Sequence, residues 1–370
     1  MKGRAGMKKE ILFVAQNMAV GGIQTSLLNL LTILDKEHKD KYEIDLFTFG
    51  KGDFLPFIPE GVNVIYGNKL LGLTATPFMT VLKSRKPLDI LLRIMTMAHV
   101  RMIGSDAFYR KMFKKHRLEK KYDTAISYFN DVPNNYFNRG TNLFVGDFTA
   151  ADKRVAWIHN DPDKMGLERD VVLKTYEKFD RIMCVSGGVK DKFDALVPEF
   201  NQITEVCYNL FCPELIIKRS EEFIPFEKKD FDIVTVCRID NFQKRVDGIV
   251  RLCKRLKDSS VTDFKWRIVG GGPDLKGNLK LAKALDVCDV IEFVGETTNP
   301  YPYIKNSDLF ALYSAYEGHP MVIGETEALG VKIITTDYAA AKEQIDASQG
   351  TICENDEIFY EEIKKLITGA

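Results

Sequence analysis

The fold class of this chain is decided by residues 11–34, which read ILFVAQNMAVGGIQTSLLNLLTIL. Residues 11–15 form a short apolar run with the length and composition of a buried strand. Residues 23–34 have apolar side chains at helical spacing, and Gly21-Gly22 between the two runs predicts a tight turn from strand to helix. A strand followed by a helix in this way is the repeating unit of a parallel sheet covered by helices.

The same alternation continues along the chain, for example from the strand-like run 182–185 to the helical run 189–196. In the first half, the other predicted strands are 44–49, 62–66, 124–128 and 155–159. In the second half, the predicted strands are 232–237, 266–269, 290–294, 309–313 and 332–335. We therefore expect an α/β protein with two Rossmann-like, doubly wound parallel-sheet domains.

The length of 370 residues also favours two domains, because it exceeds what one hydrophobic core usually supports. The predicted boundaries are 1–211 for the first domain, 212–230 for a linker and 231–370 for the second domain. The linker is predicted from Pro213, Pro225 and a dense run of charge. The charged residues of this run are Lys218, Arg219, Glu221, Glu222, Glu227, Lys228 and Lys229.

The composition is that of an ordinary globular protein, with 45% hydrophobic and 28% charged residues. The seven cysteines show neither a CxxC pair nor a metal-binding spacing, so we expect neither disulfides nor zinc. The apolar run 11–15 is too short for a signal peptide or a membrane span, which indicates a cytoplasmic location.

The formal net charge is zero, and we expect no nucleic-acid partner, but the charge is unevenly spread. Residues 83–121 contain twelve basic and three acidic residues, a net charge of +9. Apolar residues interleave there with Arg93 and Arg101, as they would in a basic helix lying on an anionic membrane. The alternative is an ordinary amphipathic helix of the core with a solvated basic face.

Several residues have side chains suited to a phosphorylated ligand. Gly21-Gly22 lets the backbone approach a phosphate or a sugar hydroxyl, although the pair taken alone favours a tight turn without a ligand. Arg238 follows a predicted strand, and Lys244 comes six residues later in a polar loop before a helix predicted to begin near Arg245. Two cations at the carboxyl edge of a parallel sheet favour a diphosphate site, with solvated loop charges as the alternative.

A second glycine turn, Val269-Gly270-Gly271-Gly272-Pro273, lacks the GxGxxG spacing of dinucleotide-binding proteins, which disfavours hydride transfer. The most specific feature is Glu317-Gly318-His319-Pro320-Met321-Val322-Ile323-Gly324-Glu325, in which seven residues separate two glutamates. The predicted strand 309–313 delivers Glu317 to the edge of the sheet, and Pro320 suits the first turn of a helix carrying Glu325. Carboxylates accept hydrogen bonds from vicinal hydroxyls, so one glutamate suits a ribose and the other a hexose.

These motifs, taken in order, resemble those of retaining glycosyltransferase family 4, with its E-x7-E signature and its GT-B fold of two Rossmann-like domains facing across a cleft. The supporting matches span about residues 8–30 and 154–345. They are Gly21-Gly22, His159, Tyr208-Asn209, Arg238, Lys244, Gly272-Pro273, Asn299-Pro300-Tyr301-Pro302-Tyr303 and Glu317 to Glu325. The bacterial members most similar in outline build capsules, exopolysaccharides and teichoic-type polymers of the cell envelope.

The resemblance implies site residues. The catalytic residues would be Glu317, His159, Arg238 and Lys244. The donor-binding residues would be Gly21, Gly22, Arg238, Lys244, Gly272, Glu317, Gly318 and Glu325. Arg238 and Lys244 would bind the donor diphosphate, Glu325 the ribose hydroxyls, and Glu317 and His159 the donor sugar. Front-face substitution needs no carboxylate nucleophile, so Glu317 is not assigned that role.

The resemblance also implies the partners. The first domain would receive a glycan or lipid-linked acceptor, and the second would bind a nucleotide-diphosphate sugar carrying a hexose or N-acetylhexosamine, with UDP-sugars the first to test. We expect no cofactor and no metal, since Asp161-Pro162-Asp163, the one Asp-x-Asp sequence considered, lies in the acceptor half. The expected location is cytoplasmic, with peripheral contact to the inner face of the plasma membrane. A nucleotide-sugar epimerase of GT-B fold and a non-catalytic glycosyltransferase-like subunit remain alternatives.

Overall fold

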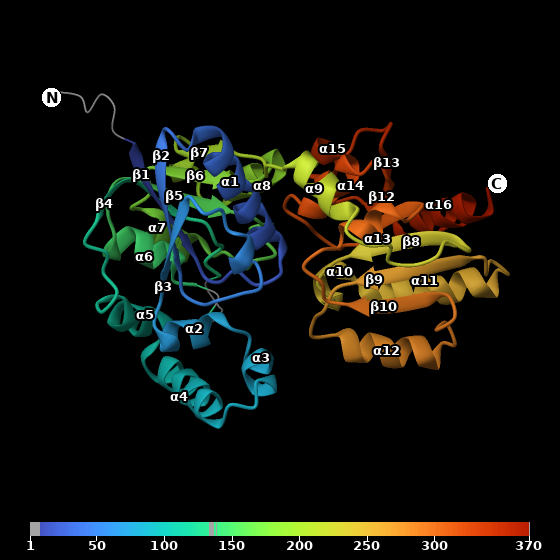
Figure 1. The fold of residues 1–370 in the computed structure, drawn as a ribbon, viewed down its shortest axis with the longest axis horizontal. Helices are drawn as coiled ribbons and strands as arrows, with labels where there is room; N and C mark the ends of the chain where they lie inside the picture. The colour runs from blue at the N-terminus through green and yellow to red at the C-terminus, as the bar shows by residue number, and fades with distance from the viewer. Residues whose placement is uncertain (1–7, 133–136, 138, 370) are drawn as a thin grey trace. The chain divides into compact units, whose positions relative to one another are not determined.

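The protein divides into two compact units between Leu210 and Phe211 in a computed structural model, and each unit is described here by itself (Figure 1). The structure describes residues 8–132, 137 and 139–369; residues 1–7, at the start of the predicted first domain, lie outside this set. Within the described residues, no helix has both the length and the apolar character needed to cross a membrane.

The first unit is built on a seven-stranded parallel sheet in the order β3-β2-β1-β4-β5-β6-β7. Its strands are β1 (Lys9–Ala15), β2 (Tyr42–Thr48), β3 (Val62–Tyr66), β4 (Lys121–Ser127), β5 (Ala150–Ile158), β6 (Arg181–Cys184) and β7 (Thr204–Val206). The order reverses between β1 and β4, which makes the carboxyl ends of these two strands the switch point of the sheet.

Helices connect the strands of the first unit. They are α1 (Gly22–His38), α2 (Lys69–Ala75), α3 (Phe78–Lys83), α4 (Pro87–Ile103), α5 (Ser105–Phe113), α6 (Thr141–Phe148), α7 (Arg169–Tyr176) and α8 (Gly187–Leu196), with short 3-10 turns at Leu55–Phe57 and Pro198–Phe200. Apolar side chains on both faces of the sheet pack under these helices, for example Leu12 and Val14 on one face and Phe13 and Ala15 on the other. Alternate residues of one strand therefore enter two different core clusters, as expected for a sheet covered on both sides.

The second unit repeats this plan with a six-stranded parallel sheet in the order β10-β9-β8-β11-β12-β13. Its strands are β8 (Phe231–Val236), β9 (Phe264–Val269), β10 (Ile291–Gly295), β11 (Leu309–Leu312), β12 (Lys332–Thr336) and β13 (Gly350–Cys353). Its helices are α9 (Pro213–Ser220), α10 (Asn241–Lys244), α11 (Val246–Asp258), α12 (Leu275–Ala284), α13 (Tyr301–Lys305), α14 (Met321–Ala328), α15 (Ala341–Gln344) and α16 (Asp356–Thr368). The switch point lies between β8 and β11.

The expected fold class of two Rossmann-like parallel-sheet domains is confirmed, and every strand predicted from the sequence is present. Two short strands at the sheet edges, β7 and β13, were not predicted. The segment 212–230, predicted as a linker, begins with helix α9, which packs against α13 and α14 of the second unit.

Residues 83–121 contain the basic helix expected from the sequence, with residues 88–103 in α4, together with further elements. They cover the end of α3, the whole of α4 and α5, and the start of β4. In Figure 1, α3 and α4 lie at the margin of the first unit, where α4 packs on α2, α3 and α5. The expectation that the basic residues of this helix are exposed is wrong for Arg93. This residue is buried on the inner face of α4 together with Thr96 and Val100.

Candidate active site

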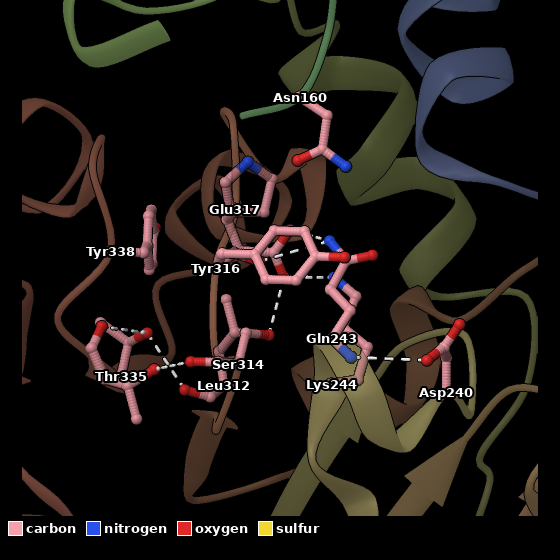
Figure 2. A network of polar contacts seen from close by, with 12 residues as sticks. Asn160, Asp240, Gln243, Lys244, Leu312, Ser314, Tyr316, Glu317, Thr335 and Tyr338 are labelled. Carbon is pink, nitrogen blue, oxygen red and sulfur yellow. Dashed lines mark hydrogen bonds and ion pairs between the residues drawn. The ribbon is translucent and has the colours of Figure 1, made fainter. Parts of the chain in front are cut away.

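A glutamate at the switch point of the second sheet is the centre of the site. Strand β11 ends at Leu312, and the chain then runs through Ser314 to Glu317, whose side chain is buried. The Ser314 hydroxyl donates to Glu317 Oε1 over 2.7 Å, and Gln243 Nε2 donates to Glu317 Oε2 over 3.3 Å. Lys244 Nζ forms an ion pair with Glu317 Oε1. Figure 2 shows these three side chains converging on the carboxylate.

Gln243 and Lys244 reach Glu317 because a short helix follows β8. The Asp240 side chain caps helix α10 by accepting from the backbone N–H groups of Phe242 (3.1 Å) and Gln243 (3.4 Å). The Gln243 carbonyl also accepts from the Ala315 N–H over 2.7 Å, which ties α10 to the chain after β11. Lys244 therefore ends a helix, where the sequence predicted a polar loop.

Arg238 differs from Lys244 in its surroundings. It follows β8 directly and is exposed. Among the described residues, its guanidinium has no hydrogen-bond or ion-pair partner, so all of its five N–H donors are available to a ligand. Arg238 and Lys244 thus lie on one connection at the carboxyl edge of the sheet, one charge free and the other held against Glu317.

The glycine turn after β9 positions that connection. A Cβ on Gly272 would lie 2.2 Å from the Ile239 carbonyl oxygen, and one on Gly270 would lie 1.9 Å from the Cys237 carbonyl oxygen. The Ile239 N–H donates to the Gly271 carbonyl over 2.8 Å. These contacts show that the glycines allow close packing of backbone against backbone.

Glu325, the second glutamate of the pair, lies on α14 and is also buried, but it has a different partner. Its Oε1 accepts from the Tyr301 hydroxyl over 3.1 Å. Burial raises the pKa of Glu325 to about 7, although the Tyr301 hydrogen bond and the charge of Arg219 oppose the shift. Gly318, directly after Glu317, is buried as well.

His159 follows β5 in the first unit and is held by backbone and ring contacts. Its Nε2 lies 2.8 Å from the Tyr128 carbonyl oxygen, and its own N–H donates to Asn130 Oδ1 over 2.8 Å. The imidazole stacks on the Trp157 ring at an interplanar angle of 13°. Burial lowers the pKa of His159 to about 3, so the ring is neutral near pH 7. A carbonyl only accepts, so Nε2 carries the proton and Nδ1 is left as an acceptor.

Gly21 and Gly22 form the turn from β1 into α1. A Cβ on Gly22 would meet nothing within 4 Å, whereas one on Gly21 would lie 2.6 Å from Gln24 Oε1. Gln24 Nε2 donates to Asn17 Oδ1 over 2.9 Å, and Asn17 Nδ2 donates to the Ala75 carbonyl over 2.8 Å. The first turn of α1 contains no acidic residue, so nothing there offsets the positive end of the helix dipole.

The structure therefore brings Lys244 and Glu317 into direct contact and places Arg238 on the same connection, while Glu325 has its own partner and the Gly21-Gly22 turn and His159 belong to the first unit. Sequence reasoning missed Gln243, Ser314 and Tyr301, which orient the two glutamates. In the sequence, only the position of these residues pointed to the site. Ser314 follows the end of a predicted strand, and Tyr301 lies in the motif of residues 299–303.

Asp161 makes a hydrogen bond and an ion pair within the first unit. Its Oδ1 accepts from the Asp163 N–H over 3.0 Å, and its Oδ2 pairs with Lys192 over 2.5 Å. Across residues 8–132, 137 and 139–369, no group of three or more His, Cys, Asp or Glu side chains is arranged to hold a metal ion.

Residues 217–370, which lie in the second unit, match the family of glycosyl transferases group 1. Over 238 residues, the chain is 26% identical to the N-acetylgalactosamine-N,N'-diacetylbacillosaminyl-diphospho-undecaprenol 4-alpha-N-acetylgalactosaminyltransferase of Campylobacter jejuni. Over 185 residues, it is 29% identical to the N-acetyl-alpha-D-glucosaminyl L-malate synthase of Bacillus anthracis. These matches cover 62% and 48% of this chain and 62% and 47% of the relatives, less than two thirds of the length of either.

The fold is similar to that of solved glycosyltransferase structures over nearly the whole chain. HepE of Anabaena in complex with UDP-glucose gives a TM-score of 0.66 at 16% identity, covering 98% of this chain and 89% of HepE. WaaG, a glycosyltransferase involved in lipopolysaccharide biosynthesis, gives a TM-score of 0.62 at 15% identity, covering 97% and 90%. At such identities the similarity establishes the fold alone, which is GT-B.

Proposed function

We propose that this protein is a retaining, family-4-like glycosyltransferase that transfers a hexose or N-acetylhexosamine from a nucleotide-diphosphate sugar to an acceptor of envelope-polysaccharide synthesis. The observation that carries the proposal is the Lys244–Glu317 ion pair at the switch point of the second sheet, on the same connection as Arg238, which is exposed and has no ion-pair partner in the part of the chain that the structure describes. Ligands of open α/β sheets bind at such switch points. This region also lies inside the segment that matches glycosyl transferases group 1.

On the donor side, Arg238 and Lys244 would bind the diphosphate. Departure of a nucleoside diphosphate concentrates negative charge, which preorganised cations stabilise without rearrangement. Glu317 is held by Ser314 and Gln243, and it would accept hydrogen bonds from hydroxyls of the donor sugar. The donor diphosphate would then compete with Glu317 for Lys244, so donor binding and the orientation of Glu317 would be coupled.

Glu325 is proposed to bind the ribose of the donor. A carboxylate accepts two hydrogen bonds from vicinal hydroxyls, whereas the protonated acid accepts less well. Because burial raises the pKa of Glu325 to about 7, ribose binding would favour loss of its proton. The donor affinity should therefore rise with pH through this range.

The acceptor is proposed to be lipid-linked, and His159 and Gly21-Gly22 would line its side of the reaction. Support comes from the names of the relatives, which include a diphospho-undecaprenol transferase and O-antigen glycosyltransferases of Escherichia coli. The neutral His159 leaves Nδ1 as an acceptor for a sugar hydroxyl, a role that needs no protonation. Gly22, with open space around its Cα, suits close approach of a ligand.

The exposed side of α3 and α4 is proposed to dock on an anionic membrane and so reach that acceptor. Large apolar side chains there are 40–81% exposed, namely Met79, Leu82, Leu88, Leu91, Ile94, Met95, Met102 and Ile103. We call these eight residues the apolar face. Lys83, Arg85, Lys86 and Arg101 are exposed beside it. An apolar face flanked by cations complements the headgroups and acyl boundary of an anionic membrane.

Screening UDP-, GDP- and ADP-sugars by thermal shift tests the donor assignment, because a ligand that binds only the folded chain raises Tm without knowledge of the acceptor. We expect one nucleotide class, with UDP the first candidate, to raise Tm in the presence of EDTA, since Arg238 and Lys244 would do the neutralising and no metal would be needed. A chain that binds no nucleotide sugar, or that requires magnesium or manganese for transfer, contradicts the corresponding part of the proposal.

A further inference from the structure

Arg93 is a buried arginine of the first unit that has no anionic partner among the described residues. It lies on the inner face of α4 and is 5% exposed. Its Nη2 makes a long contact of 3.5 Å to the Thr76 carbonyl oxygen, and its guanidinium lies 3.9 Å from the centre of the Phe137 ring. Within the described part of the chain, Nε and Nη1 have no hydrogen-bond partner. Three of the five N–H donors of this side chain are therefore unsatisfied.

This arrangement is costly for the isolated fold. A buried charge without a partner costs several kcal/mol, and arginine does not relieve that cost by losing its proton. Two acidic side chains of this unit have other partners. Asp106 pairs with Arg139 over 2.5 Å. Asp131 accepts hydrogen bonds from the Gly140 N–H over 3.0 Å and from the Thr141 hydroxyl over 2.8 Å. A group that is costly and unpaired in the free protein is typical of a binding site rather than of a structural element.

Contacts connect Arg93 to the segments near the ends of β1 and β4, the two strands at the switch point of the first sheet. Thr76 directly follows Ala75, whose carbonyl accepts from Asn17 at the end of β1. Phe137 lies in the connection after β4, the strand next to β1 across the switch point. The stacked Phe137 ring occupies a face of the guanidinium, while hydrogen bonds form in its plane and remain possible there.

We propose that Arg93 binds an oxyanion of the acceptor, a phosphate or a carboxylate, at the carboxyl edge of the first sheet. The proposal rests on the glycosyltransferase function, since it assigns the switch point of the first unit to the acceptor. The oxyanion supplies the charge and the hydrogen-bond acceptors that Nε and Nη1 lack. An acceptor with such a group would be selected over a neutral sugar, because the neutral compound leaves the arginine unpaired.

The test compares the 370-residue wild type with Arg93→Met and with Arg251→Met, which removes the same charge from an exposed position of helix α11. Each protein is titrated calorimetrically with inorganic phosphate and, separately, with malonate, at constant ionic strength set by chloride and with UDP present to occupy the proposed diphosphate site. We expect wild type and R251M to bind one of the two anions equally, and R93M to bind it at least tenfold more weakly. The anion that binds tells a phosphate from a carboxylate.

The stability of the variants gives a second readout. Because Met removes an unpaired buried charge, R93M should have a Tm in chloride equal to or above that of wild type. Equal anion binding by wild type and R93M, or a lower Tm of R93M with unchanged binding, would overturn the proposal, since an arginine that only supports the fold behaves in this way.

An arginine-labelled sample keeps the test decisive even if R93M does not fold. In [15N]arginine-labelled wild type, one Nε–H resonance, assigned by its absence from Arg93→Lys, should move on addition of the bound anion. If no such resonance moves, the proposal is wrong. UDP binding is measured on the same samples. If wild type binds UDP but neither anion, only the Arg93 site is overturned. If wild type does not bind UDP, the donor assignment is overturned instead.

Discussion

Lys244 and Glu317 form an ion pair in the second unit, and this pairing determines the expected effect of a substitution at either residue. Their side chains are 15% and 6% exposed, so removing one partner leaves a largely buried charge. Arg238 is exposed and, among the described residues, unpaired, so its removal should leave the fold intact. The two cations of the proposed diphosphate site are therefore experimentally separable.

We predict that Arg238→Ala and Lys244→Ala each lower kcat/KM at least about 100-fold, the effect of losing one preorganised group at a developing charge. R238A should do so at unchanged Tm, while K244A should also lose about 3 kcal/mol of stability because Glu317 is left unpaired. Steady-state kinetics and thermal unfolding check both statements. The double variant Lys244→Met/Glu317→Gln should recover the stability and not the activity. Near-normal kinetics in both single variants would remove the diphosphate assignment.

Glu325 gives a prediction about pH. Its pKa is raised from 4.5 to about 7, so between these values the folded chain holds a proton that the unfolded chain has lost. The free energy of unfolding therefore falls as pH rises through this window, by up to about 3 kcal/mol. Glu325→Gln should match wild type near pH 5 and be more stable than wild type near pH 8.5. Thermal unfolding at both pH values checks this, with the exposed Glu354→Gln as control. A difference between E325Q and wild type that does not change with pH would contradict the raised pKa.

The sequence predicted which charged residues share the edge of the second sheet, because the carboxyl ends of parallel strands converge there. It did not predict that Gln243 and Ser314 hold Glu317. Gln243 lies in α10, a helix of four residues that is too short to show a period, and Ser314 lies in the irregular chain after β11. Arg93 was assigned to the wrong face for a related reason. Helix α4 turns polar residues inward and large apolar ones outward, the reverse of the pattern on which such assignments rest.

At the scale of elements, the strands were predictable because each contains a short apolar run, most of which is buried in β1, β2, β8, β9, β11 and β12. The exceptions have physical causes. Strand β7 has three residues, two of them exposed, and β13 has four residues at a sheet edge, so neither gives a long apolar signal. The glycine turn after β9 was recognised as a turn, but the chain against which it packs became known only from the structure.

Gly272→Ala tests that turn. The added Cβ would lie 2.2 Å from the Ile239 carbonyl oxygen, so the connection carrying Arg238 and Lys244 has to move. We expect a loss of about 1–3 kcal/mol of stability, as for other overpacked sites, together with weaker nucleotide binding. Gly277→Ala is the matched control, because it lies in α12 with nothing within 4 Å of its Cβ and should be stabilising by about 0.5–1 kcal/mol. If G272A binds nucleotide with wild-type affinity, the turn does not position the site.

The apolar face of α3 and α4 is tested by co-sedimentation with vesicles. The 370-residue chain should bind vesicles containing anionic lipid, bind neutral vesicles weakly, and lose binding at high salt. Lys83→Ser/Arg85→Ser/Lys86→Ser should weaken binding, since each cation near an anionic surface contributes about 1 kcal/mol. The control Lys276→Ser/Lys280→Ser/Lys283→Ser removes the same charge from exposed positions of α12 and should change nothing.

Leu91→Ser/Met95→Ser separates a membrane from a protein partner. These substitutions should weaken vesicle binding because both side chains belong to the apolar face and are more than half exposed. Binding to neither kind of vesicle, with an oligomer that dissociates in L91S/M95S, would instead identify the face as an interface between copies of this chain.

At the scale of the whole molecule, the two units repeat one plan. In each sheet the strand order reverses beside the first strand of the unit, β1 or β8, and the Gly21-Gly22 turn, Arg238 and Glu317 lie in connections that follow the strands at that reversal. The second unit contributes Arg238, Lys244 and Glu317. The first contributes the Gly21-Gly22 turn and, on the inference above, Arg93. The proposed transfer requires one site for the donor and one for the acceptor, and we assign the donor to the second unit and the acceptor to the first.

Transfer itself is the most direct test of this account. The purified chain is incubated with the isotopically labelled nucleotide sugar that raises its Tm and with an undecaprenyl-diphosphate-linked glycan, in EDTA, and both the released nucleoside diphosphate and the labelled product are measured. The account predicts one nucleoside diphosphate per labelled glycoside, with the anomeric configuration of the donor retained in the NMR spectrum of the product, and loss of both signals in Arg238→Ala. Conversion of the donor to an epimer without acceptor, or nucleotide-sugar binding with no glycoside formed, would contradict it.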